Sequence, residues 1–303
     1  MNKKTQGIRT LAVAGAFIFV LGTTACSGVS AAPADNATAT SHSDLFAELP
    51  MSVQESGKLR VAVLSDYPPA TFKDADGQMA GYEIELGRAL ARELGIEIDF
   101  QPAAFTTVLT GVQANRYDTA LSSMADLPER EKTATFVNYL KSGVAMLVPR
   151  SNPKNVSEDM NSLCGLTVSA VRGTLQIDLM SEFSKENCGS DQINIPLLNS
   201  PADAILQVQT QRADAYMADA VVAQELATQS SKNSAAELDV VAFPKIQLPP
   251  AGMPVALDNK ELQNVLVKAW DKIIASGEYS EILGKWHVEV LAVDKATINA
   301  GSN

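Results

Sequence analysis

Residues 81–94, with the sequence GYEIELGRALAREL, constrain the fold of this chain more than any other segment. Gly81 permits a turn that most residues resist, because glycine has no Cβ. Glu83 and Glu85 follow in the first turn of a helix, where the helix dipole favours negative charge. Apolar positions then recur at helical spacing: Tyr82, Leu86, Ala89, Leu90 and Leu94. The segment therefore predicts a turn followed by an amphipathic helix.

Short apolar runs alternate with helical patterns along most of the chain. The first set has strand-like runs at residues 59–64, 96–100 and 119–122, with helices from residue 81 and over 105–114. The second set has strand-like runs at residues 166–170, 193–197 and 215–217, with helices over 174–183, 201–211 and 219–228. Such alternation predicts an α/β fold with a mainly parallel sheet.

Two extended segments connect the two sets and predict a hinge between two lobes. Residues 143–149 form the expected crossover, and residues 240–253, with Pro244, Pro249 and Pro250, form the expected return. The chain after residue 57 is long enough for two domains. Apolar residues at helical spacing over residues 262–273 and 277–286 predict two further helices near the end of the chain. We expect the tryptophans of these helices, Trp270 and Trp286, to pack in the core.

The N-terminus has the pattern of an export signal. Three basic residues precede the apolar run 11–21, which is too short for a resident membrane helix but suits a signal-peptide core. Residues 23–26, TTAC, resemble a bacterial lipobox with Thr23 in place of the usual leucine. We expect removal of the lipoprotein signal peptide 1–25, acylation of Cys26 and a flexible tether over 26–56; ordinary secretory cleavage is the alternative.

The net charge and the cysteine content limit which classes of function are expected. The net charge of −11 becomes −14 when the three basic residues of the signal are removed, which disfavours binding to nucleic acid. In an exported protein, Cys164 and Cys188 are best interpreted as a disulfide. A zinc site is the rival interpretation, but His42 and His287 lie far apart and no Cys-x-x-Cys pair is present, so we expect no metal and no cofactor.

The motif at 81–94 also resembles, position by position, the signature of the family 3 extracellular solute-binding proteins of bacteria. The run GEYSEILGKW at 277–286 resembles the C-terminal pattern of that family, so the resemblance covers residues 57 to about 290. It implies a periplasmic-binding-protein fold of type II with a ligand cleft between lobes. Lobe 1 would comprise residues 57–147 plus 248–292, and lobe 2 residues 148–247, followed by a C-terminal tail, 293–303.

The resemblance implies which lobe 1 residues line the cleft. Tyr67 would contact the ligand at the cleft mouth, and Phe105 would stack on it, although packing on Pro68 and core packing are the ordinary alternatives. Arg130 would bind a ligand carboxylate through its planar fork, with amides near Ser122, Ser123 and Ala125 as further donors. A surface salt bridge is the alternative for Arg130. Relatives usually have serine or threonine at the position of Ala125.

Lobe 2 would supply the other half of the site. Thr174 is expected to cap the following helix and to face the cleft, where free amides suit an anion. Asp219 corresponds to the family acid that receives the α-ammonium group of the ligand, and it could also cap a helix. Leu175 is a second departure, because relatives often have a hydroxyl there.

Together these features predict an extracytoplasmic receptor of an ABC importer, anchored by lipid to the outer face of the cell membrane. It would be a monomer that binds a polar amino acid or close relative and delivers it to a membrane permease. Ala125 and Leu175 motivate an alternative ligand: an opine, a modified amino acid, or a small carboxylate or cation. A cleft enzyme of dehydratase type is the remaining alternative. Its nominal acids are Glu83, Glu85, Asp126 and Asp66, but no pairing commits them to catalysis, and we predict no enzyme.

Overall fold

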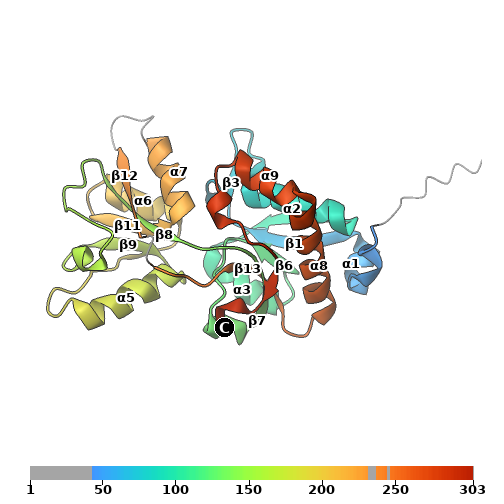
Figure 1. Cartoon of the computed structure of the whole chain (residues 1–303). Coiled ribbons are helices and arrows are strands. Elements are labelled where there is room, and N and C mark those ends of the chain that lie inside the picture. The colour runs from blue at the N-terminus through green and yellow to red at the C-terminus, as the bar shows by residue number, and fades with distance from the viewer. Residues whose placement is uncertain (1–42, 231–236, 244–245, 303) are drawn as a thin grey trace, which may run out of the picture. The chain divides into compact units, whose positions relative to one another are not determined.

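The computed structural model describes residues 43–230, 237–243 and 246–302 (Figure 1). The predicted signal peptide 1–25, the predicted lipidation site Cys26 and the first part of the predicted tether lie outside the described residues. From residue 43 onward the chain folds into two lobes, each with its own sheets and buried core. Within this part of the chain, every helix is too short or too polar to cross a membrane.

The expected tether does not extend to residue 56. Two short helices, η1 (Phe46–Glu48) and α1 (Met51–Ser56), precede the first strand. Leu45, Leu49 and Val53 are buried in the core of the first lobe. Leu45 and Leu49 flank η1 and Val53 lies in α1, so burial of apolar surface orders a segment whose composition indicated a tether.

The first lobe contains a parallel and an antiparallel sheet. The parallel sheet has the order β5-β1-β6, with β1 (Lys58–Val63), β5 (Glu97–Pro102) and β6 (Thr119–Leu121). The antiparallel sheet has the order β13-β7-β14, with β7 (Ala134–Leu140), β13 (Ala251–Ala256) and β14 (Thr297–Ile298). A small third sheet contains β2 (Asp66–Tyr67), β3 (Thr71–Lys73) and β4 (Met79–Ala80).

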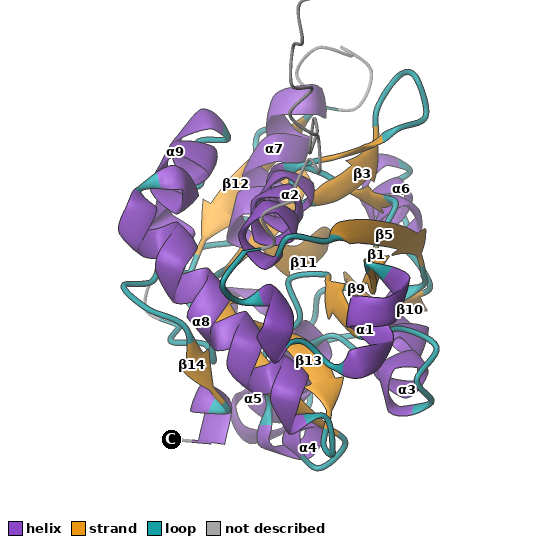
Figure 2. Cartoon of the chain, turned by 90° about the vertical axis from the view of Figure 1, so that its right-hand side faces the viewer, coloured by secondary structure: helices purple, strands orange, loops and turns teal. Residues whose placement is uncertain are grey.

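Helices cover these sheets, and Figure 2 shows α2, α8 and α9 grouped over the first lobe. The helices of this lobe are α2 (Tyr82–Leu94), α3 (Phe105–Gln113), α4 (Pro128–Glu131), α8 (Lys260–Ser276), α9 (Glu278–Lys285) and η3 (Glu289–Leu291). The predicted turn at Gly81 is confirmed: its φ is 122°, and a Cβ there would lie 2.1 Å from the Ala70 carbonyl oxygen. Trp270 is fully buried and stacks on Tyr139, whereas Trp286 is half-buried against Phe72.

The second lobe has one mixed sheet of order β10-β9-β11-β8-β12. Its strands are β8 (Val144–Pro149), β9 (Val168–Val171), β10 (Leu197–Leu198), β11 (Ala215–Asp219) and β12 (Leu238–Ala242). Its helices are η2 (Met160–Leu163), α5 (Leu175–Asn187), α6 (Pro201–Gln209) and α7 (Ala220–Ser230). Only β9, β10 and β11 run parallel, because β8 pairs antiparallel with both β11 and β12.

Both expected crossovers contain strands. The first, residues 143–149, contains β8, which is fully part of the second sheet. The return, residues 240–253, begins within β12 of the second lobe and ends within β13 of the first. The sequence indicated only connecting segments here, because each of these strands pairs with a strand that is distant along the chain. The connections between the two lobes are therefore shorter than the sequence pattern predicted, because strands occupy much of both crossovers.

The segment expected to be a C-terminal tail belongs to the first lobe. Thr297 pairs with Asn138 and Ile298 with Val137, so β14 covers the free side of β7. Ala296 is buried, and the short helix η4 (Ala300–Ser302) follows.

The predicted disulfide between Cys164 and Cys188 is present and links the end of η2 to the end of α5. Replacing both cysteines with serine should lower the free energy of unfolding by about 3 kcal/mol, because the unfolded chain regains the freedom of this loop. Denaturant melts of a chain that starts after Cys26 would measure the loss. A reductant should destabilise the parent and leave the double variant unchanged; equal stability of both would contradict the prediction.

Candidate functional site

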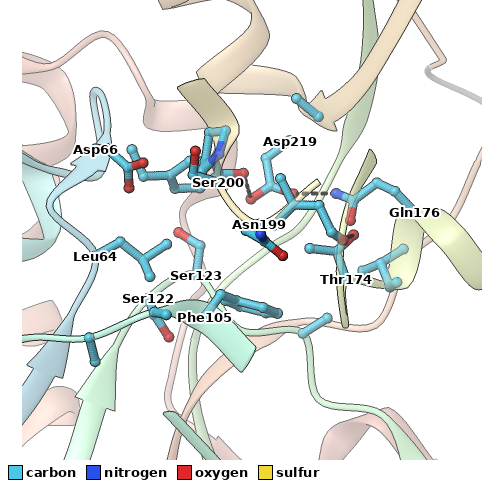
Figure 3. A pocket seen from close by; sticks show the side chains of 18 of the residues that line it. Leu64, Asp66, Phe105, Ser122, Ser123, Thr174, Gln176, Asn199, Ser200 and Asp219 are labelled. Atoms are coloured by element: carbon cyan, nitrogen blue, oxygen red, sulfur yellow. Dashed lines mark hydrogen bonds between the residues drawn. The ribbon is translucent and has the colours of Figure 1, made fainter. Parts of the chain in front are cut away.

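A cavity of about 380 Å³ lies between the lobes, and all eight residues predicted to line the cleft do line it. These residues are Tyr67, Phe105, Ser122, Ser123, Ala125, Arg130, Thr174 and Asp219. They lie on β2, at the start of α3, after β6, on α4, before α5 and at the end of β11. The cavity thus sits at the carboxyl ends of strands, where open α/β sheets place ligands (Figure 3). What each residue binds stays a prediction.

Asp219 is the acidic group of this cavity with contacts to both lobes. Its Oδ2 accepts a hydrogen bond from the Tyr67 hydroxyl at 2.7 Å, and its Oδ1 accepts one from Gln176 Nε2 at 2.8 Å (Figure 3). Burial raises the pKa of Asp219 to about 6, against the lowering effect of these two bonds and of the Arg130 charge. A carboxylate that is desolvated to this degree gains strongly from a nearby cation.

Arg130 is the basic group of the cavity, and it also reaches from one lobe to the other. Its Nη1 donates to the Ala125 carbonyl oxygen at 2.6 Å, and its Nη2 donates to the Gly173 carbonyl oxygen at 2.7 Å. The guanidinium carbon lies 5.6 Å from the centroid of the Phe105 ring. Both hydrogen-bond acceptors are neutral, so a ligand carboxylate could replace one of them with a stronger, charge-assisted bond.

The turn after β6 presents two serines to the cavity. Ser122 Oγ is buried and has no hydrogen-bond partner among the described residues, so it is available to a ligand. Ser123 has a φ of 46°, a left-handed conformation that serine rarely adopts. Its amide donates to Glu83 Oε1 at 2.9 Å, and its hydroxyl lies 3.1 Å from the Tyr82 hydroxyl. The first turn of α2 therefore holds this serine in its unusual conformation.

Glu83 does not line the cavity but supports Ser123 in its wall, a role that the sequence did not assign to it. It is fully buried, and its Oε1 also accepts a hydrogen bond from the Tyr139 hydroxyl. Its Oε2 is buried without a partner among the described residues, and burial raises the pKa of Glu83 to about 7. Its place two residues after Gly81 was the available sequence signal, but only the fold brings it beneath Ser123.

Two expectations for the second lobe need adjustment. Thr174 occupies the N-cap position of α5, but its hydroxyl donates to the Val171 carbonyl oxygen at 2.8 Å and makes no capping bond, so the expected side-chain cap is wrong. Gln176 was missed: it is buried, lines the cavity and binds Asp219. Its only sequence signal was its place, as a polar residue, in the first turn of a helix that was expected to face the cleft.

The acids that were nominated for catalysis are placed very differently. Asp66 is exposed and lines the cavity together with Asn199 and Ser200 (Figure 3). Burial of its carboxyl and the negative charge of Asp203 raise the pKa of Asp66. Glu85 pairs with Lys285 on the outside of the lobe. Asp126 is buried and accepts a hydrogen bond from the Gly301 amide. Asp66 is thus the one nominal acid that lines the cavity.

The two lobes, the two-segment connection and the shared cavity define a type II periplasmic binding fold. The chain belongs to the bacterial extracellular solute-binding proteins, family 3, whose model matches residues 59–289. The predicted family and fold class are therefore confirmed. In the residues that the structure describes, no cluster of three or more histidine, cysteine, aspartate or glutamate side chains is arranged to hold a metal ion.

Several members of this family are similar along most of the chain. The arginine-binding protein ArgT of Corynebacterium glutamicum is 30% identical over 84% of this chain and 83% of its own length. The extracellular arginine-binding protein ArtP of Bacillus subtilis is 26% identical over 78% of this chain and 89% of its own length. An ancestral arginine-binding protein bound to arginine matches with a TM-score of 0.69 and 26% identity, over 76% of this chain and 98% of that chain.

A second solved structure is relevant to the enzyme alternative. The ancestral amino acid-binding protein AncCDT-1, a precursor of cyclohexadienyl dehydratase, matches with a TM-score of 0.67 and 28% identity. The match covers 78% of this chain and 97% of that chain. The fold is therefore shared with a binding protein from which an enzyme descends, and fold alone does not assign a reaction.

Burial of Glu83 should make stability depend on pH. Its folded-state pKa of about 7 exceeds the ordinary value of 4.5, so between these values the folded state holds a proton that the unfolded state has lost. Stability is therefore expected to fall as pH rises from about 4.5 to 7, by on the order of 3 kcal/mol from this group. Glu83→Gln should flatten the dependence of stability on pH, because an amide does not titrate. Its oxygen can still accept hydrogen bonds from Ser123 and Tyr139, so the local structure should persist.

Denaturant melts of the ligand-free protein between pH 4.5 and 7.5 would measure this effect. Glu85→Gln is the matched control, because Glu85 lies on the same helix but pairs with Lys285 at the surface. The raised pKa values of Asp126 and Asp219, each about 6, should leave a residual slope in Glu83→Gln. A slope in Glu83→Gln as steep as in the parent would contradict the prediction.

Proposed function

We propose that this protein is an extracytoplasmic receptor that binds an amino acid between its lobes and delivers it to the permease of an ABC importer. The observation that carries the proposal is the presence, in one cavity, of the Arg130 guanidinium from the first lobe and the Asp219 carboxylate from the second. An amino acid carries a carboxylate and an ammonium group that match these two charges. The arginine-binding relatives support the same class of ligand.

In this proposal the ligand carboxylate binds Arg130 and displaces the Gly173 carbonyl, while the Ala125 carbonyl continues to orient the guanidinium. The buried Ser122 hydroxyl supplies a further donor. The ligand ammonium binds Asp219. The two carboxylate oxygens of Asp219 already accept hydrogen bonds from Tyr67 and Gln176, and each can accept one more. Because the two charges belong to different lobes, the ligand stabilises the closed arrangement, which is the form that the importer would recognise.

The ligand side chain is proposed to be basic, with arginine as the first candidate. Asp66 lines the cavity, and its partial burial favours a positive partner. Leu64 and Phe105 line the same cavity and suit the apolar stem of a long side chain. Ala125 and Leu175 lack the hydroxyls that are common in the family, so an opine, a modified amino acid or another small carboxylate or cation stays the alternative ligand.

The proposal also includes the membrane anchor and the assembly state. Signal cleavage before Cys26 and acylation of its sulfur would tether the protein to the outer face of the cell membrane, as the sequence of residues 1–26 indicates. We propose a monomer whose two lobes are joined by the chain before β8 and by the chain before β13. Catalysis is not part of the proposal: Glu83, Glu85 and Asp126 are engaged by neighbouring groups of the protein, and we assign Asp66 to the ligand side chain.

Removing either charge of the proposed clamp should abolish tight binding. Arg130→Ala and Asp219→Asn should each weaken arginine binding by about 100-fold or more, because one ligand charge would then be buried without a partner. Isothermal titration of the parent and variants with arginine would measure this. Arg172→Ala is the control, since Arg172 is exposed nearby and does not line the cavity. Unchanged affinity in the first two variants would reject the clamp.

The ligand groups can be tested separately from the protein groups. Agmatine lacks the carboxylate of arginine and should lose most of the affinity for the parent, because Arg130 would keep only its neutral acceptors. Equal binding of arginine and agmatine would favour the alternative of a small cation ligand.

Asp66→Asn should weaken the binding of ligands with a basic side chain. We expect affinity for arginine to fall by about tenfold, because the charge partner of the ligand side chain is removed. Affinity for a neutral amino acid such as glutamine should change by less than about twofold. Asp203→Asn is the control, because Asp203 lies close to Asp66 without lining the cavity. A titration panel in which both ligands lose affinity equally would remove Asp66 from the specificity pocket.

A further inference from the structure

We propose that residues 296–302, which lie beyond the 59–289 matched by the family model, act as a brace that positions the ligand-binding loop. We call residues 296–302 the C-terminal strap and residues 122–130 the arginine loop. The arginine loop carries Ser122, Ser123 and Ala125 into the cavity and ends at Arg130. The inference rests on the proposed function for its ligand-binding consequence, whereas the structural contact can be tested without any ligand.

The C-terminal strap is anchored along β7 by main-chain and side-chain hydrogen bonds. β14 pairs antiparallel with β7, so that Thr297 lies opposite Asn138. The Phe136 amide donates to Asn299 Oδ1 at 2.8 Å, and the Asn299 amide donates to the Phe136 carbonyl oxygen at 3.0 Å. The Ala300 amide donates to Asn138 Oδ1 at 3.1 Å. These bonds hold the strap against the sheet up to its last turn, near the C-terminus in Figure 2.

The end of the strap touches the arginine loop at one residue. The Gly301 amide donates to Asp126 Oδ2 at 3.1 Å, and the Asp126 side chain is fully buried. The approach is so close that a Cβ on Gly301 would lie 1.8 Å from the Asp126 carbonyl oxygen and 2.6 Å from its carbonyl carbon. Because the obstacle is backbone, it cannot rotate away as a side chain would, and only glycine fits at position 301 without a shift of the strap or the loop.

The same stretch of the loop is tied to the ligand site. Ala125, which precedes Asp126, accepts the hydrogen bond from Arg130 Nη1 at 2.6 Å. On its other side the loop is held by β13, since the Asp126 amide donates to the Pro250 carbonyl oxygen and Ala125 forms a bridge with Ala251. The loop is therefore fixed between β13 and the strap, and Asp126 carries the strap contact one residue from the carbonyl that orients Arg130.

Such a brace acts by pre-organisation. A planar guanidinium binds a carboxylate well only in a narrow range of orientations, so the loop must already hold Arg130 in place. If the unbraced loop keeps this geometry for about one fifth of the time, the apparent affinity falls about fivefold, because only that fraction of molecules is competent to bind. Asp126 and Gly301 are then positioning residues that never touch the ligand.

Gly301→Ala in the full chain tests the brace, and Gly284→Ala is its matched control. Gly284 lies in α9, where a Cβ would meet only Glu289 Oε1 at 3.7 Å, an ordinary contact. Hydrogen exchange of the ligand-free proteins should be about fivefold faster in Gly301→Ala at the amides of Asp126, Arg130 and Gly252, and unchanged in β9 and β11. Arginine titration should show about fivefold weaker binding in Gly301→Ala and parent-like binding in Gly284→Ala.

Each outcome decides the inference. Parent-like exchange at the loop in Gly301→Ala overturns the brace, and so does faster exchange in both lobes, which would indicate general destabilisation. Faster loop exchange with parent-like affinity overturns the positioning role. If the parent binds neither arginine nor another amino acid, the proposed function fails, but the exchange comparison still decides whether the strap holds the loop. Asp126→Asn, which keeps an acceptor for the Gly301 amide, should behave like the parent, whereas Asp126→Ala should match Gly301→Ala.

Discussion

The hydrogen bond from the Ser123 amide to the buried Glu83 carboxylate is the contact on which the architecture of the site depends. Gly81 makes this contact possible, because its left-handed backbone lets the chain turn against Ala70 and start α2 directly beneath the loop after β6. Glu83 then fixes a serine in a conformation that serine rarely adopts. A helix whose apolar face builds the core thus also sets the wall of the cavity.

The charged groups of Arg130 and Asp219 already have hydrogen-bond partners within the protein, and this determines what a ligand gains on binding. Arg130 and Asp219 each have a partner in the opposite lobe, namely Gly173 and Tyr67. A ligand therefore exchanges existing hydrogen bonds of these two residues for stronger ones, whereas the buried Ser122 hydroxyl and the Asp66 carboxylate offer it additional contacts. The net affinity depends on differences between these bonds, so geometry of the loop matters as much as the presence of the charges. This is why the contact between the C-terminal strap and Asp126 bears on binding.

Family motifs in the sequence located the cavity lining well, since all eight predicted residues lie around one cavity. The residues that support them were harder to find. Gln176 and Glu83 contact the lining residues through side chains that converge from helices far apart in the sequence. The side-chain cap expected of Thr174 is absent: its hydroxyl donates to the Val171 carbonyl oxygen and accepts no bond from an amide in the first turn of α5. Strand content was also underestimated, because β8, β12 and β13 pair with partners that are distant along the chain.

The sequence by itself determined the local elements and the chemistry: the turn at Gly81, the amphipathic α2, the cysteine pair and the polar residues that follow the strands. These features depend on spacing over a few residues, which periodicity and backbone preference decide. Tertiary structure alone decided that Leu45, Leu49 and Val53 join the core, that Glu83 lies under Ser123, and that Gly301 reaches Asp126. These contacts join segments far apart in the chain, and their free energy comes from burial and hydrogen bonds that exist only when the whole lobe has assembled.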